Sequence, residues 1–289
     1  MALSPEALAE LVADLRAVAA LTLGESDLAY GVLGGDVERL RNCVVTVVYQ
    51  KVAGSERGRP VAFNILSLLD VELAGRPTRV MHLGLVMVDP ALRGRGLSST
   101  LYGLTCVLMF LTGQGRALWV SNVSQVPAVV GMVAETFSEV FPSPRPGTRR
   151  SFDHLSLARQ IMARHRSAFG VGEEAGFDEA RFVITDAYTG GSEALKKSFE
   201  AAAPHRQERY NAFCRDQLDY RRGDDLLQLG RIDMAAAGRY LGKVAPPTTA
   251  MGLGGVALLM AARMVFLPLV HWLSANRLWG VLRPWKETA

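Results

Sequence analysis

The pattern of hydrophobic and polar positions predicts an N-terminal helix followed by β-strands. Behind Ser4 and Pro5, which suit an N-cap and a first-turn proline, leucine and valine recur at helical spacing through residue 23. Three runs dense in valine and other β-formers come next and predict strands at 42–52, 60–71 and 79–88. The glycine-marked turn between the first two strands predicts an antiparallel hairpin.

Helices and strands alternate through the middle of the chain. The predicted elements are a helix at 98–112, a strand at 117–121, a helix at 127–137, a loop at 141–151, a helix at 151–169 and a strand at 181–188. Residues 192–241 are charged and are predicted to be mostly helical. This order of elements predicts an α/β (α+β) fold.

The chain becomes strongly apolar near its C-terminus. Between 250 and 273 the only charged or ionisable side chains are Arg263 and His271. A straight helix of this length would reach about 36 Å, against a hydrocarbon core of about 30 Å. Tryptophan and basic residues mix at its end: Trp272, Arg277, Trp279, Arg283, Trp285 and Lys286. We therefore predict a segment that associates with a membrane, re-entrant or in the plane of the bilayer, with both flanks at the cytoplasmic face. The alternative is a helix that packs on the protein or on a second copy in a homodimer.

These changes in composition predict three regions. Residues 1–192 would form the α/β core, with a loop and helix insertion at about 141–178. Residues 193–245 would form a charged helical region, and residues 246–289 an apolar membrane-associating tail.

Composition narrows the function only slightly. The 289-residue chain has a formal net charge of +4, a mild basic bias that suits anionic cofactors, lipid headgroups or nucleic acid equally. Its runs of Lys and Arg are short, scattered and not interleaved with aromatic residues, so we expect no nucleic-acid partner. Cys43, Cys106 and Cys214 are far apart and the five histidines are dispersed. We expect reduced thiols and no structural metal.

The segment from Val88 to Leu101 runs from a strand through a glycine-rich turn into a helix. Unpaired amides and the aligned peptide dipoles at a helix N-terminus suit phosphate. Glycine allows the close approach of a ligand to the backbone, because a Cβ would keep the phosphates away. This stretch resembles motif A of the GNAT acetyltransferase superfamily, in which Arg or Gln, two residues, Gly, one residue and Gly or Ala follow a strand that ends in Val-x-Pro. The matching residues here are Val88, Asp89 and Pro90, then Arg93, Gly94, Arg95, Gly96, Leu97 and Ser98.

The resemblance covers roughly residues 1–140 and the strand near 181–188. It implies a GNAT-like fold, with a mixed, mostly antiparallel central sheet flanked by helices, and acyl-CoA as cosubstrate with no prosthetic group. It implies that the loop from Arg93 to Ser98 binds the pyrophosphate of coenzyme A. It also implies that the backbone of Val86 and Val88 pairs with pantetheine. Ser98 stands where the family prefers Gly or Ala, but serine is small and suits an N-cap.

The resemblance also suggests candidates for the chemistry. In family members that place a glutamate base on this strand, the base lies six residues before the Val of Val-x-Pro, and His82 occupies that position here. An imidazole can accept the ammonium proton, although a half-buried structural histidine explains His82 equally well. We expect Gly84 to leave open space beside the imidazole, and His82, Gly84, Val86 and Val88 to share one face of the strand.

The tyrosine that protonates the leaving thiolate in the family is missing, since Met132 stands in its place. Asn122 and Ser124 are the candidate replacements, with Ser121 beside them, although each fits a strand end or helix cap as well.

Together these features predict an N-acyltransferase. It would transfer an acyl group, fatty rather than acetyl, from coenzyme A or a carrier to the amine of an amphipathic or lipid acceptor at a membrane. A sphingoid base, an amino lipid or an amino acid would fit. Two alternatives remain: an acetyl-CoA-dependent acetyltransferase of a protein or small amine, and a GNAT-like protein that binds acyl-CoA without turnover.

Overall fold

The structure is a computed structural model of the full chain. It describes residues 4–23, 33, 40–52, 54, 57–113 and 117–243, together with single residues and short runs between 251 and 273. The chain divides into two compact units, 1–244 and 245–289.

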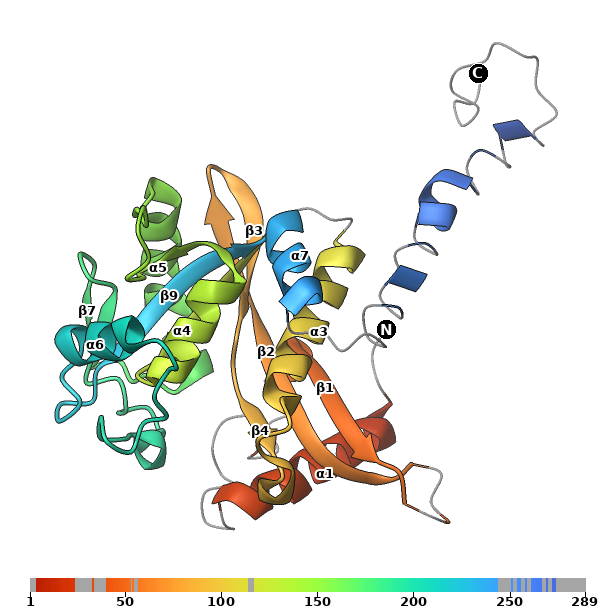
Figure 1. Ribbon diagram of the computed structural model, residues 1–289, viewed down its shortest axis with the longest axis horizontal. Coiled ribbons are helices and arrows are strands. Elements are labelled where there is room, and N and C mark those ends of the chain that lie inside the picture. The colour runs from red at the N-terminus through yellow and green to blue at the C-terminus, as the bar shows by residue number, and fades with distance from the viewer. Residues whose placement is uncertain are drawn as a thin grey trace. The chain divides into compact units, whose positions relative to one another are not determined.

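The first unit is built on a nine-stranded sheet with the order β1-β2-β3-β5-β9-β8-β7 (Figure 1). Two short strands lie off this path, β4 against β2 and β6 against β9. The strands are β1 Cys43–Gln50, β2 Arg59–Leu73, β3 Arg76–His82, β4 Val86–Val88, β5 Leu118–Ser124, β6 Ser138–Phe141, β7 Gly176–Asp178, β8 Val183–Thr185 and β9 Asp225–Ile232. Every strand pairing is antiparallel except that of β3 with β5. The predicted mixed, mostly antiparallel sheet flanked by helices is confirmed.

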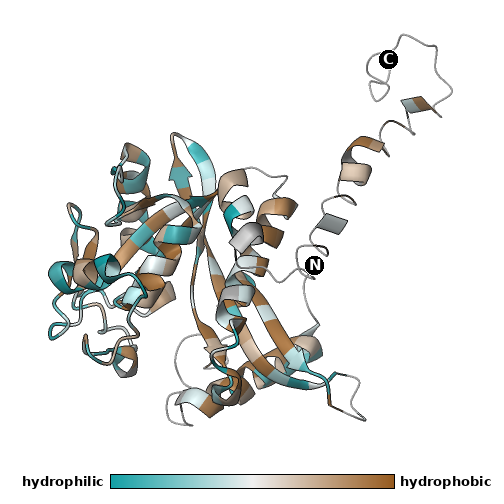
Figure 2. Cartoon of the chain, viewed as in Figure 1, coloured by the Kyte–Doolittle hydropathy of each residue, from teal (hydrophilic) through white to brown (hydrophobic). Residues whose placement is uncertain are grey.

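Helices cover both faces of the sheet. They are α1 Pro5–Leu23, α3 Leu97–Thr112, α4 Pro127–Thr136, α5 Phe152–Arg164, α6 Glu208–Gln217 and α7 Met234–Lys243, with 3₁₀ turns η3 Pro90–Leu92, η4 Arg166–Phe169 and η5 Glu193–Leu195. Alternate residues of β2 face opposite sides. Phe63 and Ile65 pack against α1, and Leu69 packs in the cluster that contains α5. Leu66 packs in the cluster that contains α3, α4 and α7. The strands between these layers carry many hydrophobic residues (Figure 2).

Strand β9 corrects the sequence-based prediction of a mostly helical region at 193–245. It lies inside the sheet between β5 and β8, and seven of its eight residues are buried. A strand buried on both faces has no alternation of polar and apolar residues, so its pattern resembles that of a buried helix segment. The region therefore contributes a central strand, flanked in sequence by α6 and α7.

In the second unit the structure describes only scattered residues, including a π-helical turn at Ala262–Phe266. Among these described residues no helix is long and apolar enough to cross a membrane. The remainder of the apolar segment predicted at 250–273, and the tryptophans at 279 and 285, lie outside the described residues. The described large apolar side chains of this segment that are exposed are Met251, Leu258, Val265, Phe266, Leu269 and Leu273.

Candidate functional site

An extra residue separates β3 from β4. Paired residues of β2 and β3 have numbers that sum to 149, as in Ser67 with His82, whereas those of β2 and β4 sum to 150. One residue is therefore inserted between the two strands, as in a β-bulge. Tyr102 on α3 donates a 2.5 Å hydrogen bond to the carbonyl of Gly84 and holds this irregular stretch against the helix.

The bulge overturns two expectations about this strand. A Cβ at Gly84 would lie 2.5 Å from the carbonyl oxygen of Ile65, so the place of the missing side chain is taken by that carbonyl and Gly84 permits a close backbone approach. His82 and Val88 also face opposite sides of the sheet. The His82 ring contacts Phe169 of η4, whereas Val88 packs with Leu101 of α3. The inserted residue reverses the alternation that the sequence suggested.

Beyond the bulge, β4 and β5 part. The parallel pairing of β3 with β5 ends at His82 and Ser121, followed by a single 2.7 Å bond from Leu83 N–H to Ser121 O. Strand β4 pairs with β2 alone. The sheet is thus open between β4 and the end of β5.

The register of β4 directs its backbone groups toward this opening. Its pairing with β2 is fixed by hydrogen bonds from Asp89 N to Val61 O and from Ile65 N to Leu85 O, both 2.8 Å. Bonded and non-bonded pairs alternate in an antiparallel ladder, so Met87 is the residue bonded to β2. The amides and carbonyls of Val86 and Val88 therefore point away from β2, as expected for an edge that can pair with an extended ligand.

A glycine-rich loop joins β4 to α3. Asp89 accepts a 2.9 Å hydrogen bond from Ala91 N–H and forms a 2.9 Å ion pair with Arg59, and these contacts hold the pKa of its carboxyl below the ordinary value. Gly94 and Gly96 adopt positive φ angles of 77° and 74°.

Gly96, rather than Ser98, is the N-cap of α3, and the helix begins at Leu97. A Cβ built at Gly94 or Gly96 would meet no atom within 4 Å, so both faces are open. Arg93, Arg95 and Ser98 are exposed.

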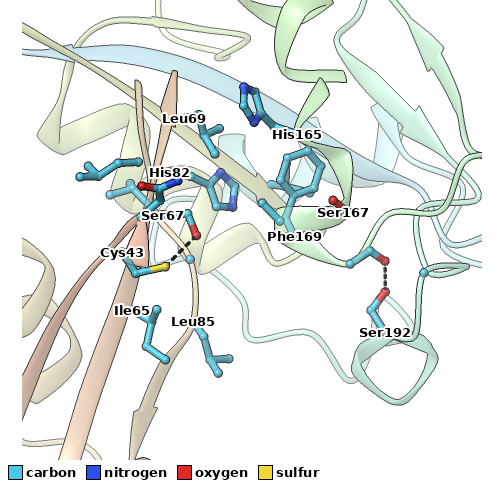
Figure 3. A pocket seen from close by; sticks show the side chains of 18 of the residues that line it. Cys43, Ile65, Ser67, Leu69, His82, Leu85, His165, Ser167, Phe169 and Ser192 are labelled. Atoms are coloured by element: carbon cyan, nitrogen blue, oxygen red, sulfur yellow. Dashed lines mark hydrogen bonds between the residues drawn. The ribbon is translucent and has the colours of Figure 1, made fainter. Parts of the chain in front are cut away.

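A cavity of about 600 Å³ lies on the α1/α5 face where the strands part (Figure 3). The β-strands contribute Cys43, Ile65, Ser67, Leu68, Leu69, Asp70, His82, Val123 and Asp225 to its wall. The bulge contributes Leu83, Gly84 and Leu85, and the loops opposite contribute residues of 165–170 and 188–195. Figure 3 shows Cys43, Ile65 and Leu85 together, with Ser167 and Ser192 across the space.

His82 is the one predicted catalytic residue that lines this cavity. Its Nδ1 lies 3.0 Å from Ser121 Oγ, and its ring centroid lies 5.0 Å from that of Phe169. Complete burial lowers its pKa to about 4. The imidazole is therefore uncharged at neutral pH, but its affinity for a proton is too low for a strong base.

The other two predicted residues are held elsewhere. Asn122 points to the opposite face, where its Nδ2 donates a 3.3 Å hydrogen bond to Gln228. Ser124 Oγ accepts a 3.1 Å bond from Val126 N–H in the turn before α4. Neither lines the cavity, and their role in protonating the thiolate stays a prediction.

Sequence reasoning missed Asp225, which is 5% exposed at the start of β9 and lines the same cavity. Its Oδ1 accepts a 3.0 Å hydrogen bond from the Tyr188 hydroxyl. Burial, with a smaller contribution from Asp224, raises its pKa to about 8. The signal in the sequence is the acidic pair at 224–225 before an apolar run. The prediction of a helical region there gives this pair no place in a sheet.

The described residues contain no group of three or more His, Cys, Asp or Glu side chains placed to hold a metal ion.

No protein-family model matches the chain, and no curated protein does either. Several solved structures are similar to part of it. A mutant of the AtaT toxin bound to the C-terminus of the antitoxin AtaR and acetyl-CoA is 18% identical, with a TM-score of 0.30, over 40% of this chain and 73% of that chain. A tetramutant of the BH1408 protein from Bacillus halodurans is 18% identical, with a TM-score of 0.25, over 36% of this chain and 73% of that chain. The KacTA–DNA complex is 19% identical, with a TM-score of 0.25, over 34% of this chain and 63% of that chain. These likenesses assign the chain to no family.

Proposed function

We propose that this protein is an acyl-CoA-dependent N-acyltransferase. The observation that carries the proposal is the continuous path from the open edge of β4 to the N-terminus of α3. The backbone groups of Val86 and Val88 point into the opening, which suits the amides of pantetheine. The path ends at the loop from Arg93 to Ser98, where exposed arginines, two glycines and the first amides of a 16-residue helix suit a pyrophosphate.

The cavity on the α1/α5 face would hold the acceptor. It adjoins the bulge at Leu83–Leu85, so a thioester laid along β4 would present its carbonyl carbon at the cavity wall. Apolar side chains such as Ile65 and Leu85 share this wall with polar ones such as Ser67 and Ser192. An amphipathic amine matches this mixture better than a wholly polar one.

Attachment to a membrane is the part of the proposal that depends on the second unit. The exposed apolar side chains between 251 and 273 favour an apolar surface as their partner. A lipid-type acceptor at that surface, such as a sphingoid base or an amino lipid, remains our proposed substrate. The alternatives are an acetyltransferase of soluble amines and a protein that retains acyl-CoA without turnover.

A pair of glycine variants tests the coenzyme A site. Gly96 and Gly75 both have positive φ angles, 74° and 72°, and at both a Cβ would meet no atom within 4 Å. Gly75 lies in the turn between β2 and β3, away from the loop. Alanine at either position should cost about 1 kcal/mol of folding stability, because both backbones are left-handed.

Only Gly96→Ala should weaken the binding of decanoyl-CoA, by at least about tenfold in calorimetry, because its Cβ would separate the phosphates from the amides. Equal affinities of the Gly96→Ala and Gly75→Ala variants would contradict the placement of the pyrophosphate. A wild-type chain that binds no coenzyme A derivative would contradict the proposed function.

A further inference from the structure

The cavity carries acidic groups and lacks fixed cations. None of the described residues that line it is a lysine or an arginine, whereas two are aspartates, Asp70 and Asp225. Asp70 is exposed and pairs with Arg79 at 2.9 Å. Asp225 is buried, and no cation is recorded within ion-pair distance of it among the described residues. A negative charge on a ligand would meet no lysine or arginine among the described residues of this wall.

The environment of Asp225 leaves one of its oxygens available. Oδ1 accepts the hydroxyl of Tyr188, and Oδ2 has no hydrogen-bond partner among the described residues. Oδ2 is also not among their solvent-inaccessible unpaired atoms, and Asp225 lines the cavity. The neighbouring Asp224 is neutralised by Arg222 through two bonds of 2.7 and 2.8 Å. A buried carboxylate with one unpaired oxygen can bind a cation or a hydrogen-bond donor.

The register of the strands places Asp225 beside the opening of the sheet. Val123 of β5 lines the cavity and pairs with Leu227 of β9, which lies two residues after Asp225. Ser121, two residues before Val123, pairs with His82 of β3. With about 4.8 Å between strands and about 3.3 Å per residue, His82 and Asp225 each lie roughly 8 Å from Val123 in Cα position. Asp225 shares its face of β9 with Leu227 and Leu229, which pack in the α5 cluster. Strands β3 and β9 lie on opposite sides of β5, and the two displacements along β5 run in opposite directions. The Cα atoms of His82 and Asp225 therefore lie roughly 16 Å apart, with Val123 between them.

We infer that Asp225 binds the ammonium group of the acceptor and takes one of its protons, and that the acceptor is an amine without a carboxylate or phosphate group. This rests on the proposed function. An N–H bond of the ammonium breaks and its proton moves to Oδ2. The freed lone pair forms the C–N bond at the thioester carbonyl, the C–S bond breaks, and the second proton of the attacking amine passes to the departing thiolate. The products are an amide, the free thiol and one proton on Asp225.

The proton affinities of the two titratable groups favour Asp225 over His82 as the base. A general base works best when its pKa is near the working pH. The pKa of Asp225 is raised to about 8, whereas that of His82 is lowered to about 4, in both cases mainly by burial. Tyr188 lowers the pKa of Asp225 and Asp224 raises it, while Arg222 is engaged by Asp224. The rate should therefore rise with pH through about 8.

The charged groups of the same cavity wall also indicate the class of acceptor. An amino alcohol brings a cation and a neutral hydroxyl, both of which the wall can accept. An amino acid adds a carboxylate that no lysine or arginine of the described wall would balance. A desolvated charge without a partner is costly, so the cavity should discriminate against it. Of the lipid-type acceptors considered above, this favours a sphingoid base over an amino acid.

The test compares 2-aminooctan-1-ol with 2-aminooctanoic acid, which differ only in a hydroxymethyl group against a carboxylate. Calorimetry on the full chain at about pH 9, above the pKa of about 8 of Asp225, should give at least about tenfold tighter binding of the amino alcohol. The Asp225→Asn variant should lose that binding by about tenfold or more, whereas Asp70→Asn at the same cavity should not. Equal affinity for the two probes, or unchanged binding by Asp225→Asn, would overturn the inference.

Kinetics with decanoyl-CoA separate the base from a structural role. Asp225→Asn should lower kcat/KM by about 10²–10⁴ while decanoyl-CoA still binds. Tyr188→Phe leaves the carboxylate but removes the bond that lowers its pKa, so the rise of kcat/KM should move to higher pH and reach a similar plateau. An unmoved pH profile in Tyr188→Phe would count against Asp225 as the base even if Asp225→Asn fails to fold. A chain that binds the amino alcohol through Asp225 but no acyl-CoA would refute the proposed function and leave the amine site standing.

Discussion

At the scale of single residues, burial controls the proton affinity of His82. Its ring is enclosed by Ser121 and Phe169, and the pKa falls from an ordinary 6.5 to about 4. The unfolded chain therefore binds a proton at a higher pH than the folded one does. His82 costs no stability above pH 6.5, and the folded state loses stability as the pH falls from about 6.5 toward 4.

The His82→Gln variant should remove this loss. The difference in free energy of unfolding between pH 7 and pH 4, measured by urea denaturation, should be smaller than in the wild type by about 3 kcal/mol. His165→Gln, at the mouth of the same cavity, is the control for losing a histidine as such. A wild-type pH dependence in His82→Gln would mean that the imidazole is hydrated in solution.

Residue-scale prediction from the sequence reaches only local patterns, and the binding of coenzyme A at Gly94 and Gly96 stays a prediction. Gly94 and Gly96 were identifiable because a strand, a glycine-rich turn and a helix follow one another along the chain. Asp225 was not, because its role depends on a strand pairing that brings it next to β5, a hundred residues away in sequence. A buried carboxylate cannot be recognised before its neighbours in the sheet are known.

At the scale of elements, the bulge between β3 and β4 decides how the sheet opens. Gly84 allows the backbone of this stretch to approach the Ile65 carbonyl, and an alanine Cβ would lie 2.5 Å from that oxygen. A backbone atom cannot move aside as a side chain can, so Gly84→Ala should destabilise the protein by about 1–3 kcal/mol. It should also lower acyl-transfer activity, because the two strands must shift.

Gly238 in α7 provides a matched comparison, since a Cβ there would meet nothing within 4 Å. Gly238→Ala should raise stability by roughly 0.5–1 kcal/mol through helix propensity alone. Thermal unfolding of both variants measures the two effects. A Gly84→Ala variant as stable as the wild type would show that the bulge relaxes freely.

Sequence periodicity predicts most of the strands and helices in the first half of the chain, because an amphipathic pattern indicates burial on one face. It failed for β9, where both faces are buried, and it could not reveal the bulge. The residue inserted between β3 and β4 has no distinctive sequence pattern, and it is visible only in how the two strands pair with β2. The face on which His82 lies was therefore beyond the reach of the sequence.

At the scale of the whole molecule, the first unit depends on a strand contributed late in the chain. Strand β9 lies between β5 and β8, so a chain that ends at 192 lacks the strand that joins the two parts of the sheet. A chain of residues 1–244 retains every strand of the first unit. We expect residues 1–244 to unfold cooperatively and residues 1–192 to remain unfolded, as measured by circular dichroism and urea denaturation.

The same truncation separates acyl-CoA binding from attachment to a membrane. The loop from Arg93 to Ser98 and the cavity belong to residues 1–244, whereas the exposed apolar side chains such as Phe266 belong to the second unit. The 1–244 chain should bind decanoyl-CoA with the affinity of the full chain. In sedimentation with vesicles of phosphatidylcholine and phosphatidylglycerol, the full chain should pellet with the lipid and the 1–244 chain should stay in solution. Equal sedimentation of both would place the lipid-binding surface in the first unit, and an amphipathic acceptor would then reach the cavity without help from residues 245–289.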